Sequence, residues 1–142
     1  MWPAGWFGSI TTIAAGALAV VSPAGPVGVD VEPVASTSWL SSGPSAAFGT
    51  REQGEMGKCP ALAIHLFTVK EAMFKAVPYP AQSGLLLRHI RPLACAGQGV
   101  SRSWVAHLAD IVILAKSVVL GDHACSVAYH DNGTLGGGHA GS

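Results

Sequence analysis

Charged residues are scarce in this chain of 142 residues: eight are acidic and eight basic, 11% of the whole, with no net charge when histidines are neutral. The first lysine or arginine is Arg51, and no cluster of basic residues follows it. A nucleic-acid-binding surface needs such a cluster to neutralise phosphates. The composition therefore argues against nucleic acid as a partner.

Cysteines and long apolar runs are also few. Cys59, Cys95 and Cys125 are odd in number and far apart, which argues against a disulfide framework and predicts reduced thiols in a cytoplasm. The apolar run at residues 13–21 is shorter than the roughly 20 residues that cross a membrane. It also lacks the positively charged start of a signal peptide. We therefore expect a cytoplasmic protein without a membrane segment.

The length is that of one domain, which we expect to span residues 1–130. Residues 131–142 are rich in glycine, and we expect a flexible tail there. Just before it, His123, Cys125 and His130 invite a zinc interpretation. Their spacing matches none of the strong zinc patterns, and we expect the segment to be a loop rather than a metal site.

The few charges gather in two short blocks, of which the first is residues 27–33. Valines alternate there with Asp30 and Glu32, behind a glycine and ahead of a proline, a pattern typical of a half-buried strand. Side chains two positions apart on a strand point the same way, so Asp30 and Glu32 share one face. Their mutual repulsion is relieved by a proton, by a basic partner or by a hard cation with oxygen ligands.

The second block lies in residues 61–77, a run of good helix formers that Pro78 ends. Glu71 and Lys75 are one turn apart on one side of this helix, and Lys70 flanks them. A helix packed on the sheet would bring Glu71 to the carboxylate pair, with lysines nearby for phosphate oxygens. Because magnesium takes a few carboxylates plus substrate phosphates, the two blocks together predict a magnesium and phosphate site. Taken singly, each block is more often an exposed, solvated surface.

The remaining pattern predicts an α+β fold in which a small antiparallel sheet packs against the long helix. Residues 36–57 are expected to form an irregular connection, and residues 101–120 are apolar enough for either a strand pair or a buried helix. We expect strands at residues 8–12, 14–21 and 27–32, and helices at 51–56 and 61–77.

The order, spacing and residue detail of the two blocks resemble the 4'-phosphopantetheinyl transferases, in particular their siderophore-synthase subgroup. That family has a Gly-hydrophobic-Asp-hydrophobic-Glu strand, which corresponds to residues 28–32. Its Phe/Trp-Ser/Thr-x-Lys-Glu-Ala/Ser-x-x-Lys helix corresponds to residues 67–75, and a Tyr-Pro pair follows at residues 79–80. Residues 2–11 are similar to its Trp-Pro-x-Gly and Gly-Ser-Ile/Leu segments, so the resemblance covers residues 2–80.

The resemblance implies the fold of one lobe of such a transferase. It also implies transfer of the phosphopantetheine arm of coenzyme A to a serine of an acyl or peptidyl carrier protein, with release of adenosine 3',5'-bisphosphate. Asp30, Glu32 and Glu71 would bind magnesium against the coenzyme A pyrophosphate. Lys70 would contact phosphate, Lys75 would assist proton transfer or stabilise the phosphates, and Glu71 would orient or deprotonate the serine.

Three features depart from the family pattern. Thr12 stands where the family has a histidine that contacts a coenzyme A phosphate, and threonine brings no positive charge. The family's basic N-terminal portion has no counterpart here, and Pro78 alters the end of the helix. The alternative to an enzyme is therefore a non-catalytic remnant or fragment that keeps the fold and a carrier-protein surface. A third possibility is a structural domain whose acidic pair is merely solvated.

Overall fold

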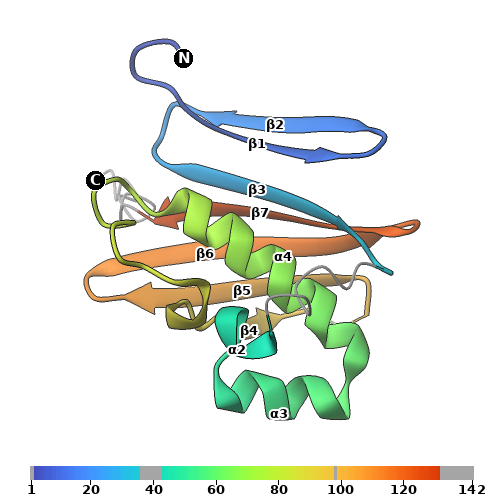
Figure 1. Cartoon of the computed structure of the whole chain (residues 1–142). Coiled ribbons are helices and arrows are strands. Elements are labelled where there is room, and N and C mark those ends of the chain that lie inside the picture. The colour runs from blue at the N-terminus through green and yellow to red at the C-terminus, as the bar shows by residue number, and fades with distance from the viewer. Residues whose placement is uncertain (1, 36–42, 98, 132–142) are drawn as a thin grey trace, which may run out of the picture.

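The computed structural model describes residues 2–35, 43–97 and 99–131, which form an α+β fold with two antiparallel sheets. A hairpin of two strands lies along the first strand of the main sheet (Figure 1). The hairpin consists of β1 (Phe7–Ile13) and β2 (Gly16–Ser22). The five-stranded main sheet has the order β3 (Val27–Pro33), β7 (His123–Asp131), β6 (Ile111–Leu120), β5 (Ser101–Leu108) and β4 (Leu93–Ala96).

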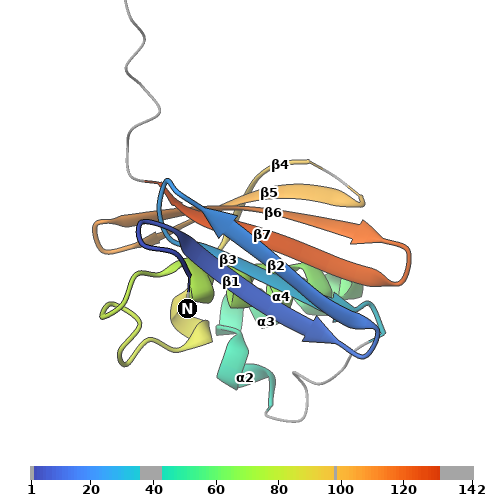
Figure 2. The same ribbon diagram turned by 90° about the horizontal axis from the view of Figure 1, so that it is seen from above.

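The helices of the described residues lie on one side of the main sheet (Figures 1 and 2). The longest of them, α4, crosses the sheet and contacts β6, β7 and β3. No helix in the described ranges combines the length and apolar composition needed to span a membrane. In chain order the helices are α2 (Pro44–Ala47), α3 (Thr50–Lys58), α4 (Pro60–Ala76) and the single-turn 3₁₀ helix η1 (Leu87–His89).

The ends and the buried face of α4 follow from its sequence. Pro60 stands in the first turn, where a missing N–H costs nothing, and Val77 is extended because it precedes Pro78. Between them the helix buries one side against the sheet. The main hydrophobic core forms at this contact, with Val69, Ala72, Met73 and Ala76 from α4, Trp104, Ala106, Ile113, Ala115 and Ala128 from the sheet, and Phe48 and Met56 at one end.

Small residues let α4 approach the sheet closely where it crosses β3. A Cβ atom on Gly28 would overlap the carbonyl oxygen of Ala72 and would lie 2.9 Å from the backbone nitrogen of Ala76. Ala128, the neighbour of Gly28 on β7, is fully buried. Glycine is therefore required at position 28 because the helix backbone rests on the strand there.

Most of the elements expected from the sequence are confirmed. The long helix, the short helix after residue 50 and the three N-terminal strands all form, although the second strand begins at Gly16 rather than residue 14. The undecided segment at residues 101–120 is a strand pair, β5 and β6, whose turn places Ala109 at φ 53°. The expected small antiparallel sheet packed against a long helix is therefore present.

The end of the chain departs from expectation. The segment containing His123, Cys125 and His130 was expected to be a loop, but it is the central strand β7. Asp131 ends that strand and does not belong to a tail, whereas residues 132–142 lie outside the described residues. The strand was missed because its buried face consists of small residues, Ala124, Ser126 and Ala128, which carry little strand propensity.

The close approach at Gly28 gives a stability test. We expect Gly28→Ala to destabilise the fold by about 1–3 kcal/mol, the usual cost of overpacking, because the helix or the strand must shift. The same substitution at Gly54, an exposed position of α3 with open space around it, should stabilise by about 0.5–1 kcal/mol. Urea unfolding of both variants measures the difference, and equal effects would contradict this account.

Candidate functional site

Strand β3 directs both of its carboxylates toward α4. Gly28 lies against the Ala72 carbonyl group of that helix, and strand alternation gives Asp30 and Glu32 the same direction. Asp30 is buried, with 5% of its surface exposed, and Glu32 is half-buried. The structure thus places the acidic pair on one strand face, as the strand period predicts, and turns that face toward the long helix.

Lys75 of α4 lies beside this pair and forms hydrogen bonds to β3. Its ammonium donates hydrogen bonds to Asp30 Oδ1 at 2.9 Å and to the carbonyl oxygen of Val29 at 3.0 Å. The hydroxyl of Thr11 donates a further, longer bond to Asp30 Oδ1 at 3.3 Å, and the N–H of Val29 donates to Ser9 Oγ. Strand β1 and helix α4 therefore together bond the backbone of Val29 and the carboxylate of Asp30.

Glu71 completes the group from the helix. Burial raises the pKa of Glu71, the nearby charge of Asp30 raises it further, Lys75 opposes the rise, and Glu32 adds a smaller increase. All three charged groups expected near Glu71 thus act on it. We call Asp30, Glu32, Glu71 and Lys75 the carboxylate site.

The carboxylate site has the donor set of a hard-cation site. Oδ2 of Asp30 is buried and has no hydrogen-bond partner in the described ranges, which leaves one ligand atom unused. Among the described residues, however, no three His, Cys, Asp or Glu side chains are already grouped as ligands of one ion. Lys75 supplies positive charge at Asp30 in this arrangement. The residues fit magnesium chemically, and side-chain adjustment of the glutamates would have to complete its ligand set.

Lys70, which the resemblance places on a phosphate, has different neighbours. Its side chain is fully buried, its ammonium lies 2.6 Å from Glu52 Oε2, and it lies 5.4 Å from the centre of the Phe48 ring. Burial lowers the pKa of Lys70, and the hydrogen bond that Lys70 donates to Glu52, with the negative charge of Glu52, opposes that effect. Glu52 also accepts the N–H of Gly49 at the start of α3. Lys70 therefore ties α3 to α4, on a side of the helix away from Asp30.

Thr12, the other residue assigned to coenzyme A by resemblance, is exposed on β1. Its neighbour Thr11 is the buried threonine that contacts Asp30. Sequence reasoning missed Thr11 and Ser9. The signal was present as two polar residues at alternate positions of an otherwise apolar strand, which is the pattern of one shared face.

A buried polar row runs across the sheet beneath α4 from the carboxylate site. Two hydroxyls in the row are bonded by the helix: Ser126 Oγ lies 2.7 Å from Thr68 Oγ1, and Ser117 Oγ lies 2.9 Å from His65 Nδ1. Burial, and next the charge of Arg102, lower the pKa of His65 and favour its neutral form. His65 is thus a packed structural residue. The row consists of Asp30, Ser126, Ser117 and Arg102, neighbours on successive strands.

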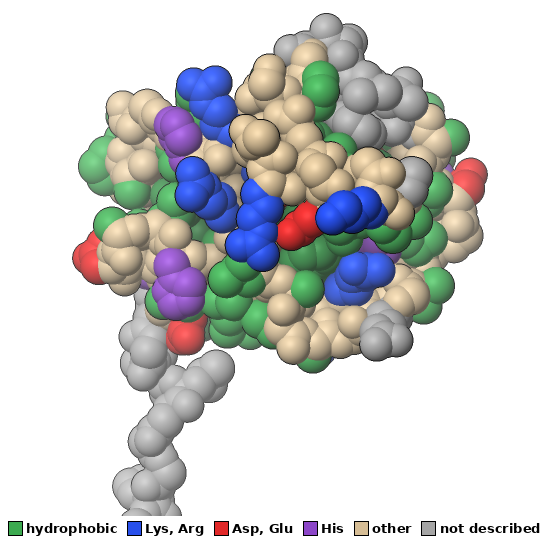
Figure 3. All heavy atoms as spheres, turned by 90° about the horizontal axis from the view of Figure 1, so that it is seen from below, with side chains coloured by type: hydrophobic (Ala, Val, Ile, Leu, Met, Phe, Trp, Pro, Cys, Tyr) green, Lys and Arg blue, Asp and Glu red, His purple; other side chains and the backbone are tan. Residues whose placement is uncertain are grey.

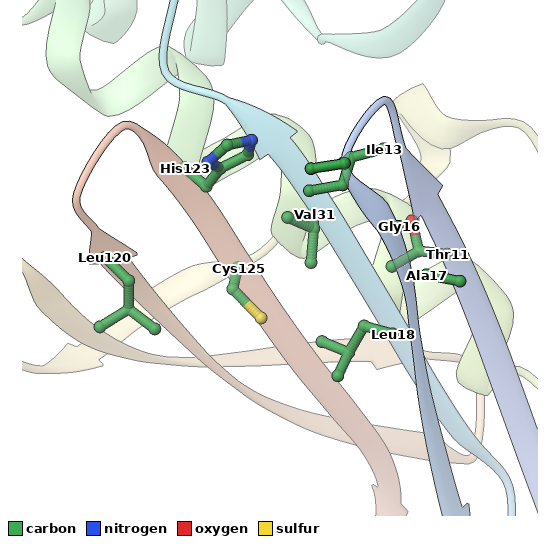
Figure 4. Close-up of a pocket in the computed structure, with 10 residues that line it drawn as sticks. Thr11, Ile13, Gly16, Ala17, Leu18, Val31, Leu120, His123 and Cys125 are labelled. Atoms are coloured by element: carbon green, nitrogen blue, oxygen red, sulfur yellow. The ribbon is translucent and has the colours of Figure 1, made fainter.

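An apolar cavity of about 350 Å³ lies between the β1–β2 hairpin and the other face of β3 and β7 (Figure 4). Cys125 points into it, and burial together with the charge of Asp30 raises the pKa of this thiol, so it stays protonated at neutral pH. His123 also lines the cavity, whereas His130 belongs to the opposite face of β7. These three residues are therefore not placed to share a zinc ion. The walls include Ile13, Leu18, Val31 and Leu120.

Comparison of the sequence with protein-family models and with curated proteins finds no match. A functional conclusion therefore rests on the residues of the carboxylate site and on the motif resemblance.

The raised pKa of Glu71 gives a pH-dependent prediction. A carboxyl whose pKa is higher in the folded state binds protons more tightly there, so its contribution to stability falls as pH rises through the folded pKa. We expect Glu71→Gln to raise the urea midpoint at about pH 8, because it removes a desolvated, repelled charge. The gain should shrink at about pH 4, where Glu71 is largely protonated.

Glu55→Gln is the matched control, since Glu55 pairs with Arg51 in solvent and such pairs contribute little. A loss of stability in Glu71→Gln at about pH 8 would contradict the assignment of Glu71 as a repelled charge.

Proposed function

We propose that this chain transfers the 4'-phosphopantetheine group from coenzyme A to a serine of an acyl or peptidyl carrier protein, with magnesium as cofactor, on a transferase-like lobe. The observation that supports the proposal is that carboxylates of β3 and α4 lie near enough to act on one another: Asp30, Glu32 and Lys75 all shift the pKa of Glu71. The motif resemblance suggests the reaction. That reaction requires carboxylates of the strand and of the helix to lie near one another, so that they can hold magnesium together.

In this reaction the serine hydroxyl oxygen attacks the phosphorus that carries the pantetheine arm. A new P–O bond forms, the bond to the bridging pyrophosphate oxygen breaks, and its electron pair leaves with adenosine 3',5'-bisphosphate. Glu71 accepts the serine proton, directly or through a water molecule, and its raised pKa makes it a stronger base than an ordinary glutamate. Magnesium, when held by Asp30, Glu32 and Glu71, supplies positive charge for the phosphoryl and leaving groups.

Lys75 and Lys70 have different roles in this proposal. Lys75, part-buried beside Asp30, is available to donate to phosphate oxygens when its bond to the carboxylate is exchanged. Lys70 forms a buried ion pair with Glu52 and has a structural role. Thr12 adds at most one neutral hydrogen bond. Because a charge-assisted hydrogen bond is worth about 1.5–3 kcal/mol, each phosphate contact that is missing weakens coenzyme A binding by about ten- to a hundredfold.

The second candidate is a non-catalytic carrier-protein binder derived from such an enzyme. One observation favours it: Lys75 forms an ion pair with Asp30 at 2.9 Å, so Asp30 also has a structural role. The two candidates differ in whether magnesium binds. They therefore call for a binding test as well as an activity test.

The activity test incubates the chain with coenzyme A, magnesium and a generic carrier protein, and follows the mass of the carrier protein. We expect slow magnesium-dependent modification of its serine. Glu71→Gln should lower the rate by about a hundredfold or more, the usual contribution of a general base, and Glu55→Gln should leave it unchanged. Thr12→His should raise the rate by restoring a positive charge.

The binding test measures the unfolding temperature as magnesium is added. Magnesium should raise it for the wild type but much less for Glu71→Gln, since a ligand stabilises the state that binds it. If the folded chain shows neither transfer nor stabilisation by magnesium, the enzyme proposal is refuted and the carrier-protein binder remains. Activity equal to wild type in Glu71→Gln would remove Glu71 from the mechanism.

A further inference from the structure

A second charged cavity lies at the other end of α4 from the carboxylate site. It has a volume of about 600 Å³ and opens between the start of α3, the N-terminal half of α4 and the strands β4 and β5. Arg51, Arg91 and Arg102 line it, with Glu52 and Glu55 beside them. Figure 3 shows the face of the molecule that carries α3, where Lys and Arg side chains gather. We call this space the arginine cavity.

Two of the three arginines have no counter-ion among the described residues. Arg51 pairs with Glu55 at 3.1 Å, and Glu52 is occupied by Lys70. Neither Arg91 nor Arg102 forms an ion pair with any carboxylate in the described part of the chain. The positive charge of Arg91 also lowers the pKa of Lys70, and that of Arg102 lowers the pKa of His65. The arginine cavity therefore carries positive charge that the carboxylates of the described residues do not pair with.

The polar atoms within reach of the arginine cavity are also incompletely bonded. Among the residues that the structure describes, Nε of Arg102 is a buried donor without an acceptor, and Oε1 of Glu52 is a buried acceptor without a donor. Leaving such groups unpaired costs free energy. Both residues also line the arginine cavity, so a ligand bound there lies next to both.

The rest of the wall is apolar and firmly held. Leu62 and Leu66 come from α4, and Trp104 comes from β5, where its indole N–H donates to Ser117 Oγ at 2.8 Å. Trp104 is 3% exposed, so this wall belongs to the core. A ligand that fits has a charged end for the arginines and an apolar body for this wall.

We propose that the arginine cavity binds a small organic oxyanion, a carboxylate or phosphate ester with an apolar body. Its charged end lies between Arg91 and Arg102, because a guanidinium group matches two oxygens of one oxyanion. Its body packs on Leu62, Leu66 and Trp104. This site is independent of phosphopantetheine transfer, since the carboxylate site lies over β3 and the arginine cavity over β5 and β4.

The test titrates the full chain with phenyl phosphate, phenylacetate and inorganic phosphate, without magnesium, by calorimetry and by the NMR signal of the Trp104 indole N–H. We expect the aromatic anions to bind and to shift that signal, and inorganic phosphate to bind more weakly. Arg102→Gln and Arg91→Gln should each weaken binding by about ten- to a hundredfold, the effect of losing a charge-assisted hydrogen bond. Arg88→Gln, at an exposed position of η1 outside the cavity, should bind like wild type.

Several outcomes overturn the proposal. They are absence of binding by all probes, unchanged affinity in both Arg91→Gln and Arg102→Gln, or equal affinity of inorganic phosphate and the aromatic anions, which would remove the apolar contact. Unfolding curves check that the variants fold, and we expect no loss of stability in Arg102→Gln because it removes an unpaired buried donor. Glu71→Gln should bind the probes normally, so failure of transfer and failure of this site are told apart.

Discussion

The close contact of α4 with β3 at Gly28 is the constraint on which the carboxylate site depends. The helix backbone occupies the space that a side chain at position 28 would need. This short separation lets Lys75 reach both Asp30 and the Val29 carbonyl group with ordinary hydrogen-bond lengths. A bulkier residue at position 28 would push the helix outward and separate Lys75 from both acceptors. The glycine that begins the acidic motif is therefore as important to the site as its carboxylates.

Buried Asp30 and half-buried Glu71 contribute to stability with opposite signs. Asp30 is compensated, because Lys75 and Thr11 both donate to its Oδ1. Glu71 is only partly compensated, and its raised pKa records desolvation and the repulsion of its neighbours. Removing Asp30 would leave Lys75 without its carboxylate, whereas removing Glu71 relieves a repulsion. Such an uncompensated acid in a charged group is more typical of a functional site than of a structural ion pair.

The sequence predicted those parts of the fold that depend on local periodicity. The alternation around Asp30 and the uninterrupted run that ends before Pro78 each correspond to an element with nearly the expected bounds. The neighbours of Lys70 were not predictable in the same way. Consecutive helix residues diverge by about 100°, so Lys70 beside Glu71 in sequence points to another side, where α3 brings Glu52. That pairing depends on how α3 packs, which no local pattern specifies. Strand β7 was missed for a related reason, because its small buried residues are selected by the close packing of α4.

The polar row beneath α4 has an acid at one end, on β3, and an arginine at the other, on β5. Asp30 and Arg102 stand at opposite ends of the row, and the serines between them are bonded locally to Thr68 and His65 rather than to either charge. The acid and the arginine therefore lie too far apart to form a pair, and each end needs its own counter-ion. Lys75 of α4 provides one for Asp30. The described part of the chain provides none for Arg102, whose buried Nε has no acceptor. The fold thus pairs Asp30 with a lysine of α4, whereas Arg102 has no counter-ion among the described residues.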